Sequence, residues 1–283
     1  ILIGKDAGLN SANDNNISMG LSSGENLQNG YNINIGDYTA SGDDANIPVN
    51  DDHGRNINIG HFAGRLSTNS KKCINIGIAA GMLSNQVKSE NINIGYFSGK
   101  NLQSGSDNLF LGNLSGENIK SGSNNLLIGN NTISEILTNS SIPVNNNIII
   151  GTNAGQYLES EQNIIMGINS GKTRTVGNSN ILIGYNSGVN LVNSDNSSKT
   201  GNNFFIGNES GFQSKGEYNM LLGHKSGKSL TGNYNSILGY NSASSESAGG
   251  NYNTIFGYNT GSLGFSGDNN TILGLSLIHI SEP

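Results

Sequence analysis

Short apolar segments recur along the whole chain, and each of them ends in a glycine. The segment Asn91–Gly99, Asn-Ile-Asn-Ile-Gly-Tyr-Phe-Ser-Gly, shows the pattern clearly. Sixteen glycines equivalent to Gly95 are here called the repeat glycines, and twelve of their fifteen spacings are 16 to 18 residues. Such a period predicts a solenoid, in which each repeat forms one coil and stacks on its neighbours. The repeat glycines are Gly4, Gly20, Gly36, Gly60, Gly77, Gly95, Gly112, Gly129, Gly151, Gly167, Gly184, Gly207, Gly223, Gly239, Gly257 and Gly274.

The three residues before each repeat glycine predict a short strand. The residues one and three before it, here called the flanking positions, are apolar in each of the first thirteen repeats, as at Ile92 and Ile94. The residue two before it, here called the middle position, is polar in repeats two to six, as at Asn93, and apolar from the seventh repeat on, as at Phe110. This alternation predicts that the flanking positions face the core of the coil and that the middle position faces outward.

An outward middle position has a consequence for assembly. From Phe110 onward it would form a long apolar stripe, which is unusual on the surface of a monomer. We therefore expect the chain to self-associate through this stripe. The alternative is that the strand lies between two layers of one chain.

Asparagine stands four residues before the repeat glycine in fourteen of the fifteen repeats where that position exists, and Cys73 is the exception. A repeated asparagine at the start of a strand predicts a ladder, in which each side-chain amide bonds its neighbours one coil away and satisfies turn backbone. The asparagines singled out for this structural role are Asn32, Asn56, Asn91, Asn108, Asn125, Asn147, Asn163 and Asn180.

The residues after the strand predict a tight corner. We expect the repeat glycine to adopt a positive φ or to lie close to neighbouring backbone. A small residue follows three positions later and usually a glycine after that, as at Ser98 and Gly99, and an apolar residue such as Leu102 then predicts a second, shorter strand. The fold expected is an all-β, two-sided parallel β-solenoid of about sixteen repeats, forming one domain over residues 1–274. The glycines singled out are Gly95, Gly112, Gly151 and Gly184.

Composition narrows the possible partners. The net charge is −6 and is spread along the chain, so no basic face is offered to nucleic acid or to an anionic membrane. A single cysteine excludes an internal disulfide framework. No apolar run approaches the ~20 residues that span a bilayer.

Both ends of the sequence suggest a fragment. The chain starts at Ile1, inside a copy of the repeat and without methionine. Residues 275–283 resemble the translation of a transposase adapter used in sequencing libraries, and they place Leu277 and Ile278 where the repeat calls for a small residue and a glycine. We expect the last nine residues to be non-native.

The repeat, Asn-x-(Ile/Leu)-(Ile/Leu)-Gly-x-x-(Ser/Ala)-Gly, resembles the head repeats of trimeric autotransporter adhesins, and more closely the repeats of phage tail fibres. Asn253–Gly261 and Asn180–Gly188 carry the resemblance best, and it covers residues 1–274. It implies a left-handed β-roll with three chains to a rod, which holds a receptor-binding or anchoring part away from a surface. It places the protein on a virion or bacterial cell surface.

No catalytic constellation can be argued from the residues. Gly167–Thr173 and Gly223–Ser229 resemble phosphate loops but have three residues between the glycines, where such a loop needs four. The histidines lie in different repeats without metal-ligand spacing. We expect no cofactor and no enzymatic activity. The histidines are His53, His61, His224 and His279.

Three longer repeats predict loops that leave the coil, at residues 41–55, 133–146 and 193–202. Loops on one face of a solenoid often bind partners. Their carboxylates also include a weak candidate for Ca²⁺ binding. The candidate binding residues are Asp44, Pro48, His53, Pro143, Asn145 and Asp195, and the candidate metal ligands are Asp43, Asp44, Asp51 and Asp52.

Three functions remain open at the level of sequence. The first is a trimeric shaft or head of a viral fibre or surface adhesin, whose loops attach to a receptor or glycan. The second is a monomeric solenoid that binds glycan or ice. The third is a polysaccharide hydrolase, which needs paired carboxylates on one face, although the acidic residues avoid the strand columns.

Overall fold

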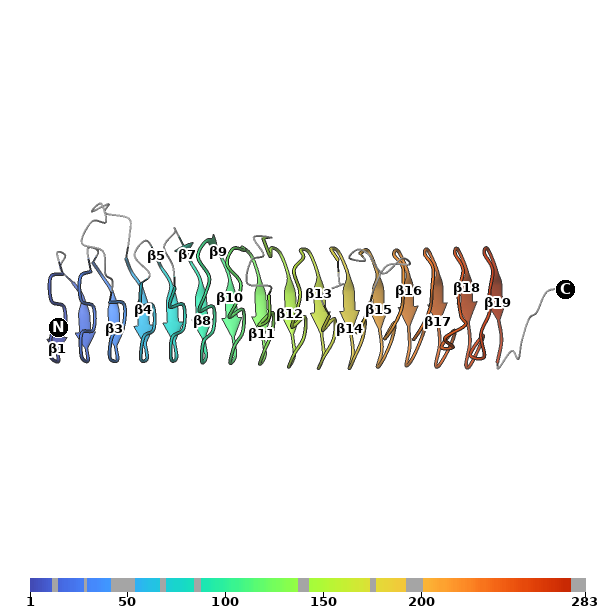
Figure 1. The fold of residues 1–283 in the computed structure, drawn as a ribbon, viewed down its shortest axis with the longest axis horizontal. Helices are drawn as coiled ribbons and strands as arrows, with labels where there is room; N and C mark the ends of the chain where they lie inside the picture. Colours follow the sequence, from blue (N-terminus) through green and yellow to red (C-terminus); the bar gives the residue numbers. More distant parts are fainter. Residues whose placement is uncertain are drawn as a thin grey trace. The chain divides into compact units, whose positions relative to one another are not determined.

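The computed structural model describes residues 1–11, 15–27, 30–41, 54–66, 70–83, 88–136, 143–173, 177–191 and 201–275, without the side chains of residues 88 and 89. These ranges contain short parallel strands and no helix, so the predicted all-β solenoid is confirmed (Figure 1). The chain divides into two compact units, Ile1–Asn146 and Asn147–Pro283. Each unit is described by itself.

The first unit contains a parallel sheet of eight strands in chain order and a smaller sheet on the other side of the coil. The larger sheet consists of β1 (Leu2–Ile3), β2 (Ile17–Met19), β3 (Ile33–Ile35), β4 (Ile57–Ile59), β6 (Ile74–Ile76), β8 (Ile92–Ile94), β10 (Leu109–Leu111) and β11 (Leu126–Ile128). The smaller sheet consists of β5 (Ser70–Lys71), β7 (Lys88–Ser89) and β9 (Gly105–Ser106).

The second unit also stacks eight parallel strands in chain order, and isolated bridges such as that between Lys215 and Thr231 join its other side. Its strands are β12 (Ile148–Ile150), β13 (Ile164–Met166), β14 (Ile181–Ile183), β15 (Phe204–Ile206), β16 (Met220–Leu222), β17 (Ser236–Leu238), β18 (Thr254–Phe256) and β19 (Thr271–Leu273).

Equivalent positions of successive repeats lie directly opposite one another. Leu109 of β10 pairs with Ile92 on one side and with Leu126 on the other. The same alignment joins Ile164 to Ile148 and to Ile181 in the second unit. A column in the sequence is therefore a row of stacked side chains in the structure.

The prediction of which strand side chains face the core was wrong. The middle position points into the coil, and Phe110, Leu127 and Phe205 are completely buried there. The flanking positions point outward, as Ile35 shows with an exposed fraction of 38% and Leu111 with 39%. Because side chains alternate along a strand, the change of face affects every strand residue together.

The physical reason is that an asparagine can be buried at little cost when its side-chain amide is hydrogen-bonded. In the early repeats the polar middle position indicated exposure, yet Asn34, Asn58, Asn75 and Asn93 are all buried. In the later repeats all three strand positions are apolar, so hydrophobicity alone could not distinguish the two faces.

The interior of each coil is filled from two sides. Middle-position side chains meet the apolar residue seven positions after the repeat glycine, and Leu102, Ile119, Leu158, Leu191 and Leu230 are buried as expected. None of these five residues lies in a strand, so the prediction of a second strand there was wrong. In the first unit the second strand comes three residues later, where β9 follows Leu102.

An amide ladder runs through the interior of the first unit. The Nδ2 of Asn58 donates to Asn34 Oδ1 at 3.0 Å, and Asn75 and Asn93 each continue the row at 2.8 Å. The row ends at the ring of Phe110, where Asn93 Oδ1 is buried and has no hydrogen-bond partner. The interior therefore changes from amide to hydrocarbon at one coil boundary.

The boundary between Asn93 and Phe110 allows a test of the interior amide ladder. Asn93→Leu would remove the unpaired Asn93 Oδ1 and leave Asn75 Oδ1 unpaired in its place. Asn75→Leu would leave Asn58 Oδ1 and Asn93 Nδ2 without partners while Asn93 Oδ1 stays unpaired. Since each buried unpaired group costs about 1–3 kcal/mol, Asn75→Leu should destabilise the protein by about 2 kcal/mol more than Asn93→Leu in urea unfolding. Equal losses of stability would show that the number of unpaired amide groups in the interior does not determine the cost of these substitutions.

Candidate functional site

The outward face of the strands is the main candidate surface. On each unit the two flanking positions form neighbouring rows of apolar side chains. Ile35 and Leu111 represent the rows in the first unit, and Ile148 and Met220, each 39% exposed, represent them in the second. We call this surface the sheet face. It presents contiguous apolar area that one chain leaves in contact with water.

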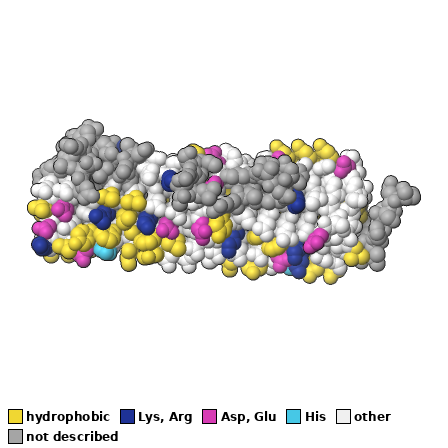
Figure 2. Space-filling view, in the orientation of Figure 1, with side chains coloured by type: hydrophobic (Ala, Val, Ile, Leu, Met, Phe, Trp, Pro, Cys, Tyr) yellow, Lys and Arg dark blue, Asp and Glu magenta, His cyan; other side chains and the backbone are white. Residues whose placement is uncertain are grey.

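The sheet face carries no charge. In all sixteen repeats the flanking positions are apolar or, at Ser236, Thr254 and Thr271, hydroxyl-bearing. Charged side chains lie at its border, where Lys72 and Glu90 stand five residues before their repeat glycines. Figure 2 likewise shows hydrophobic side chains in patches on the face in view, with acidic and basic side chains scattered between them.

A shallow hollow follows the border of the sheet face in the first unit. It has a volume of about 460 Å³. Its apolar lining consists of Ile92, Leu109 and Leu126, and its polar lining includes Glu90 and Asp107. The three coils that line the hollow contribute equivalent positions to it, so the relief of the face repeats from coil to coil there.

The asparagine ladder predicted at the start of the strands is present. Asn108 donates both its backbone N–H, at 3.0 Å, and its side-chain Nδ2, at 2.8 Å, to Asn91 Oδ1. The same Nδ2 also donates to the carbonyl of Gly122 at 2.8 Å, which joins the two sides of the coil. Equivalent bonds tie Asn125 to Asn108, Asn56 to Asn32, Asn163 to Asn147 and Asn180 to Asn163.

The repeat glycines allow the coils to stack closely. Gly95 has a φ of +138°, and a Cβ atom placed on it would lie 2.3 Å from the carbonyl oxygen of Gly112. Gly112, Gly151 and Gly184 have φ values of +134°, +138° and +138°, with equivalent contacts of 2.3 to 2.5 Å. A side chain at these positions would meet both a strained backbone and the next coil.

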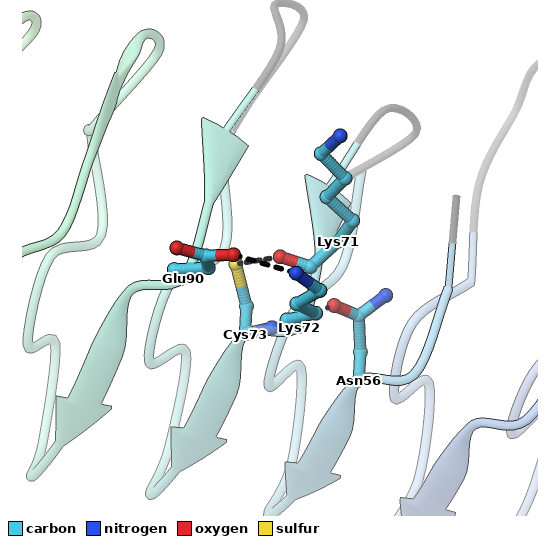
Figure 3. A network of polar contacts seen from close by, with 5 residues as sticks. All are labelled: Asn56, Lys71, Lys72, Cys73 and Glu90. Carbon is cyan, nitrogen blue, oxygen red and sulfur yellow. Dashed lines mark hydrogen bonds and ion pairs between the residues drawn. The ribbon is translucent and has the colours of Figure 1, made fainter. Parts of the chain in front are cut away.

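Cys73 interrupts the ladder. Its backbone N–H donates to Asn56 Oδ1 at 2.9 Å, but its thiol supplies no oxygen to the next repeat. An ion pair crosses the same boundary, with Lys72 Nζ donating to Glu90 Oε1 at 2.7 Å (Figure 3). Both charged side chains are about half exposed, so this pair stabilises the stack little.

Two carboxyl groups of the first unit have shifted pKa values. The hydrogen bond from Lys72, and then its positive charge, hold the pKa of Glu90 below its usual range. Burial raises the pKa of Glu117, against the opposing charge of Lys100 at 3.9 Å. The lowered pKa of Glu90 therefore reflects its pairing with Lys72, and the raised pKa of Glu117 reflects its burial.

Most of the predicted loop and metal residues lie outside the described residues. These are Asp43, Asp44, Pro48, Asp51, Asp52, His53 and Asp195. Two of the loop candidates are described. Pro143 is exposed, and Asn145 is held in the coil because its Oδ1 accepts the backbone N–H of Ser123 at 2.8 Å.

The remaining chemical candidates are dispersed. Among the described residues no group of three or more His, Cys, Asp or Glu side chains could hold a metal ion. His61 stacks on Phe62 at 3.8 Å and His224 on Tyr240 at 4.9 Å, in different units. The two loops of phosphate-binding appearance form ordinary corners, and Lys228 pairs with Glu209 at 3.1 Å. Within the described ranges no helix has the length and hydropathy to span a bilayer.

The position of the ladder asparagines indicates which strand side chains face outward, although the hydrophobic pattern does not. Side chains alternate along a strand, so the residues four and two before the repeat glycine must share one side. If the asparagine ladder lies inside, the middle position also lies inside and the flanking positions lie outside. Asn91 and Asn93 together therefore place Ile92 and Ile94 on the surface.

Comparison with known proteins assigns no lineage to the chain: no family model, curated protein or solved structure matches it.

The break at Cys73 can be repaired. Cys73→Asn should supply the oxygen that Asn91 lacks and raise the free energy of unfolding by about 1–2 kcal/mol, the net contribution of one or two buried hydrogen bonds. Cys73→Ser is the control, because its side chain is too short to bridge coils. Urea unfolding measures both. An unchanged stability for Cys73→Asn would contradict a stabilising role for each ladder step.

The Lys72–Glu90 pair predicts a pH effect. A lowered pKa means that Glu90 contributes stability above its unfolded pKa and that this contribution is lost as the pH falls through the folded pKa. Lys72→Met should raise the pKa of Glu90 towards its usual value and reduce the loss of stability in acid. Carboxyl titration by NMR measures the pKa. Lys71→Met should change it less, because the Lys71 charge is the smallest of the influences on Glu90.

Proposed function

We propose that this chain is a structural segment of an extracellular or virion-surface fibre, a shaft or adhesin head that assembles from three copies and presents loops for attachment. The observation that supports the proposal is the uncharged, apolar sheet face on each unit. Burial of such a face against another protein gains roughly 25 cal/mol for each Å² of apolar surface removed from water.

A second copy of the same chain is the partner that suits this face best. The relief of the sheet face repeats with every coil, so a partner can fit each coil only if it has the same period. Another copy has that period by construction, and because neither face carries charge at the flanking positions, no repulsion opposes their contact. The number of three comes from the resemblance to trimeric fibres and adhesins.

A monomeric glycan-binding solenoid is the second candidate. It is favoured by the aromatic residues on the corners of the first unit, where Tyr38 packs on Phe62 at 5.5 Å and Tyr96 on Phe97 at 4.0 Å. Tyr38 is 36% exposed and Tyr96 is 45% exposed. A stable monomer that binds a glycan array would favour this candidate over the fibre.

Charge placed on the sheet face tests the assembly. Met166→Lys introduces an ammonium group into a flanking row of β13, where burial against a second copy would require it to be desolvated. The wild-type chain of residues 1–283 should sediment as a trimer, and Met166→Lys should shift it towards the monomer at the same concentration. Analytical ultracentrifugation gives the stoichiometry.

Ile168→Lys is the matched control for this experiment. Ile168 belongs to the same coil and is 52% exposed, but it lies on the corner, outside the sheet face. It should remain trimeric, with circular dichroism checking that both variants fold. A wild-type chain that stays monomeric would overturn the proposed assembly, and equal effects of the two variants would exclude the sheet face as its interface.

A further inference from the structure

Three tyrosines in successive coils of the second unit form a stacked row. Tyr218, Tyr234 and Tyr252 each stand five residues before a repeat glycine. Their ring centroids are 4.8 and 4.9 Å apart, and the angles between their planes are 6° and 1°. All three are exposed, at 47%, 47% and 57%. Figure 2 shows a short row of hydrophobic side chains at the upper border near β16–β18.

Local backbone preference does not explain these tyrosines. Each has a φ of +58°, in the left-handed region that disfavours bulky side chains. The equivalent positions in other repeats adopt the same conformation with residues of several kinds, among them asparagine, which tolerates it, as at Asn124 and Asn202, but also Tyr31, Arg55 and Lys72. Three consecutive coils nevertheless carry tyrosine, and the stacking of the rings is what these three positions share.

A second pair lies just after the strands of the same coils. Tyr240 and Tyr258 stand one residue after their repeat glycines, with centroids 5.1 Å apart and planes inclined by 9°. Their exposed fractions are 49% and 52%. The second unit therefore holds two separate places at which exposed phenols from adjacent coils face each other.

We propose that these tyrosines are an oxidative modification site, at which dityrosine bonds join adjacent coils of one chain. The pairs are Tyr218 or Tyr252 with Tyr234, and Tyr240 with Tyr258. The co-reactant is a peroxide acting through a peroxidase. The proposal does not rest on the proposed function, because both rings of each pair belong to the same chain.

The chemistry balances as a two-electron oxidation. Each phenol loses one electron and its hydroxyl proton to become a phenoxyl radical. The two radicals then couple, forming one carbon–carbon bond between the ring carbons beside the oxygens. Each of those carbons gives up its proton, and each phenol oxygen regains one, which restores both aromatic rings. Hydrogen peroxide takes up the two electrons and two protons and becomes two molecules of water.

The stacked geometry favours coupling within the chain. The coil spacing holds the two backbones at a fixed distance, and the exposed rings need only tilt about their side-chain torsions to bring the reacting carbons together. Peroxidase-generated oxidant can reach them from solvent. An isolated tyrosine has no such partner: Tyr185 is 48% exposed, but the equivalent residues of the neighbouring repeats are Ile168 and Asn208.

The test oxidises the chain of residues 1–283, in dilute solution, with peroxidase and hydrogen peroxide. We expect dityrosine fluorescence, a chain that still migrates as a single polypeptide on a denaturing gel, and linked peptides containing the named pairs with the mass of two hydrogens missing. Tyr234→Phe preserves the stacking and removes the central phenol. It should lower the dityrosine yield by about half, since the two sites are independent and a row of three yields one pair at most.

Two further variants complete the experiment. Tyr185→Phe is the matched control and should leave the yield unchanged, whereas combined Tyr234→Phe and Tyr258→Phe should abolish the cross-links within the chain. Cross-links found only between chains, an undiminished yield from the double variant, or oxidation without any dityrosine would each overturn the proposal. A monomeric wild-type chain would overturn the proposed assembly and leave this site standing.

Discussion

The rest of the structure depends on the hydrogen bonds that the side-chain oxygen of one asparagine per coil accepts from the next coil. In the complete steps of the ladder this oxygen accepts two bonds from the asparagine of the following coil, one from the backbone and one from the side chain, as Asn91 does from Asn108. Short three-residue strands pair through few backbone hydrogen bonds. The ladder adds bonds at the point where each strand starts and keeps equivalent residues opposite one another.

This alignment determines what each side of the strand can do. The narrow interior accepts one strand side chain per coil, which can be an amide such as Asn75 or a hydrocarbon such as Leu127. The exterior receives two side chains per coil and gathers them into the sheet face. The contacts that stabilise the chain and the surface proposed to recognise a second copy therefore lie on opposite sides of the same three residues.

The regular features of the fold could be predicted from the sequence because the same pattern of residues recurs in each repeat. The period, the strand positions and the asparagine ladder all follow from columns that recur through the sixteen copies, with asparagine in fourteen of them. The direction of the side chains could not be read from hydrophobicity, because Ile92 and Ile94 are apolar yet exposed to solvent in part, while Asn93 is polar and buried. Buried amides that bond one another do not pay the usual desolvation penalty, so polarity stops indicating exposure.

Surface chemistry was harder to predict than the fold for a related reason. The tyrosine rows depend on side chains that are 16 or 18 residues apart in the chain and become neighbours only through stacking. Cys73 and Glu90 show the same effect, since the missing ladder step and the ion pair occur at one boundary between coils.

The unpaired oxygen of Asn93 has a consequence for how the stack of coils can be extended. A coil that donates amide bonds to the coil before it and accepts them from the coil after it can be duplicated or lost without disturbing its neighbours, provided that they have the same interior. At Asn93 an amide coil meets Phe110, so an added coil with an amide interior fits on the Asn93 side and one with a hydrocarbon interior fits on the Phe110 side. The boundary is therefore a junction between two kinds of interior, and each kind can be lengthened only by coils that match it.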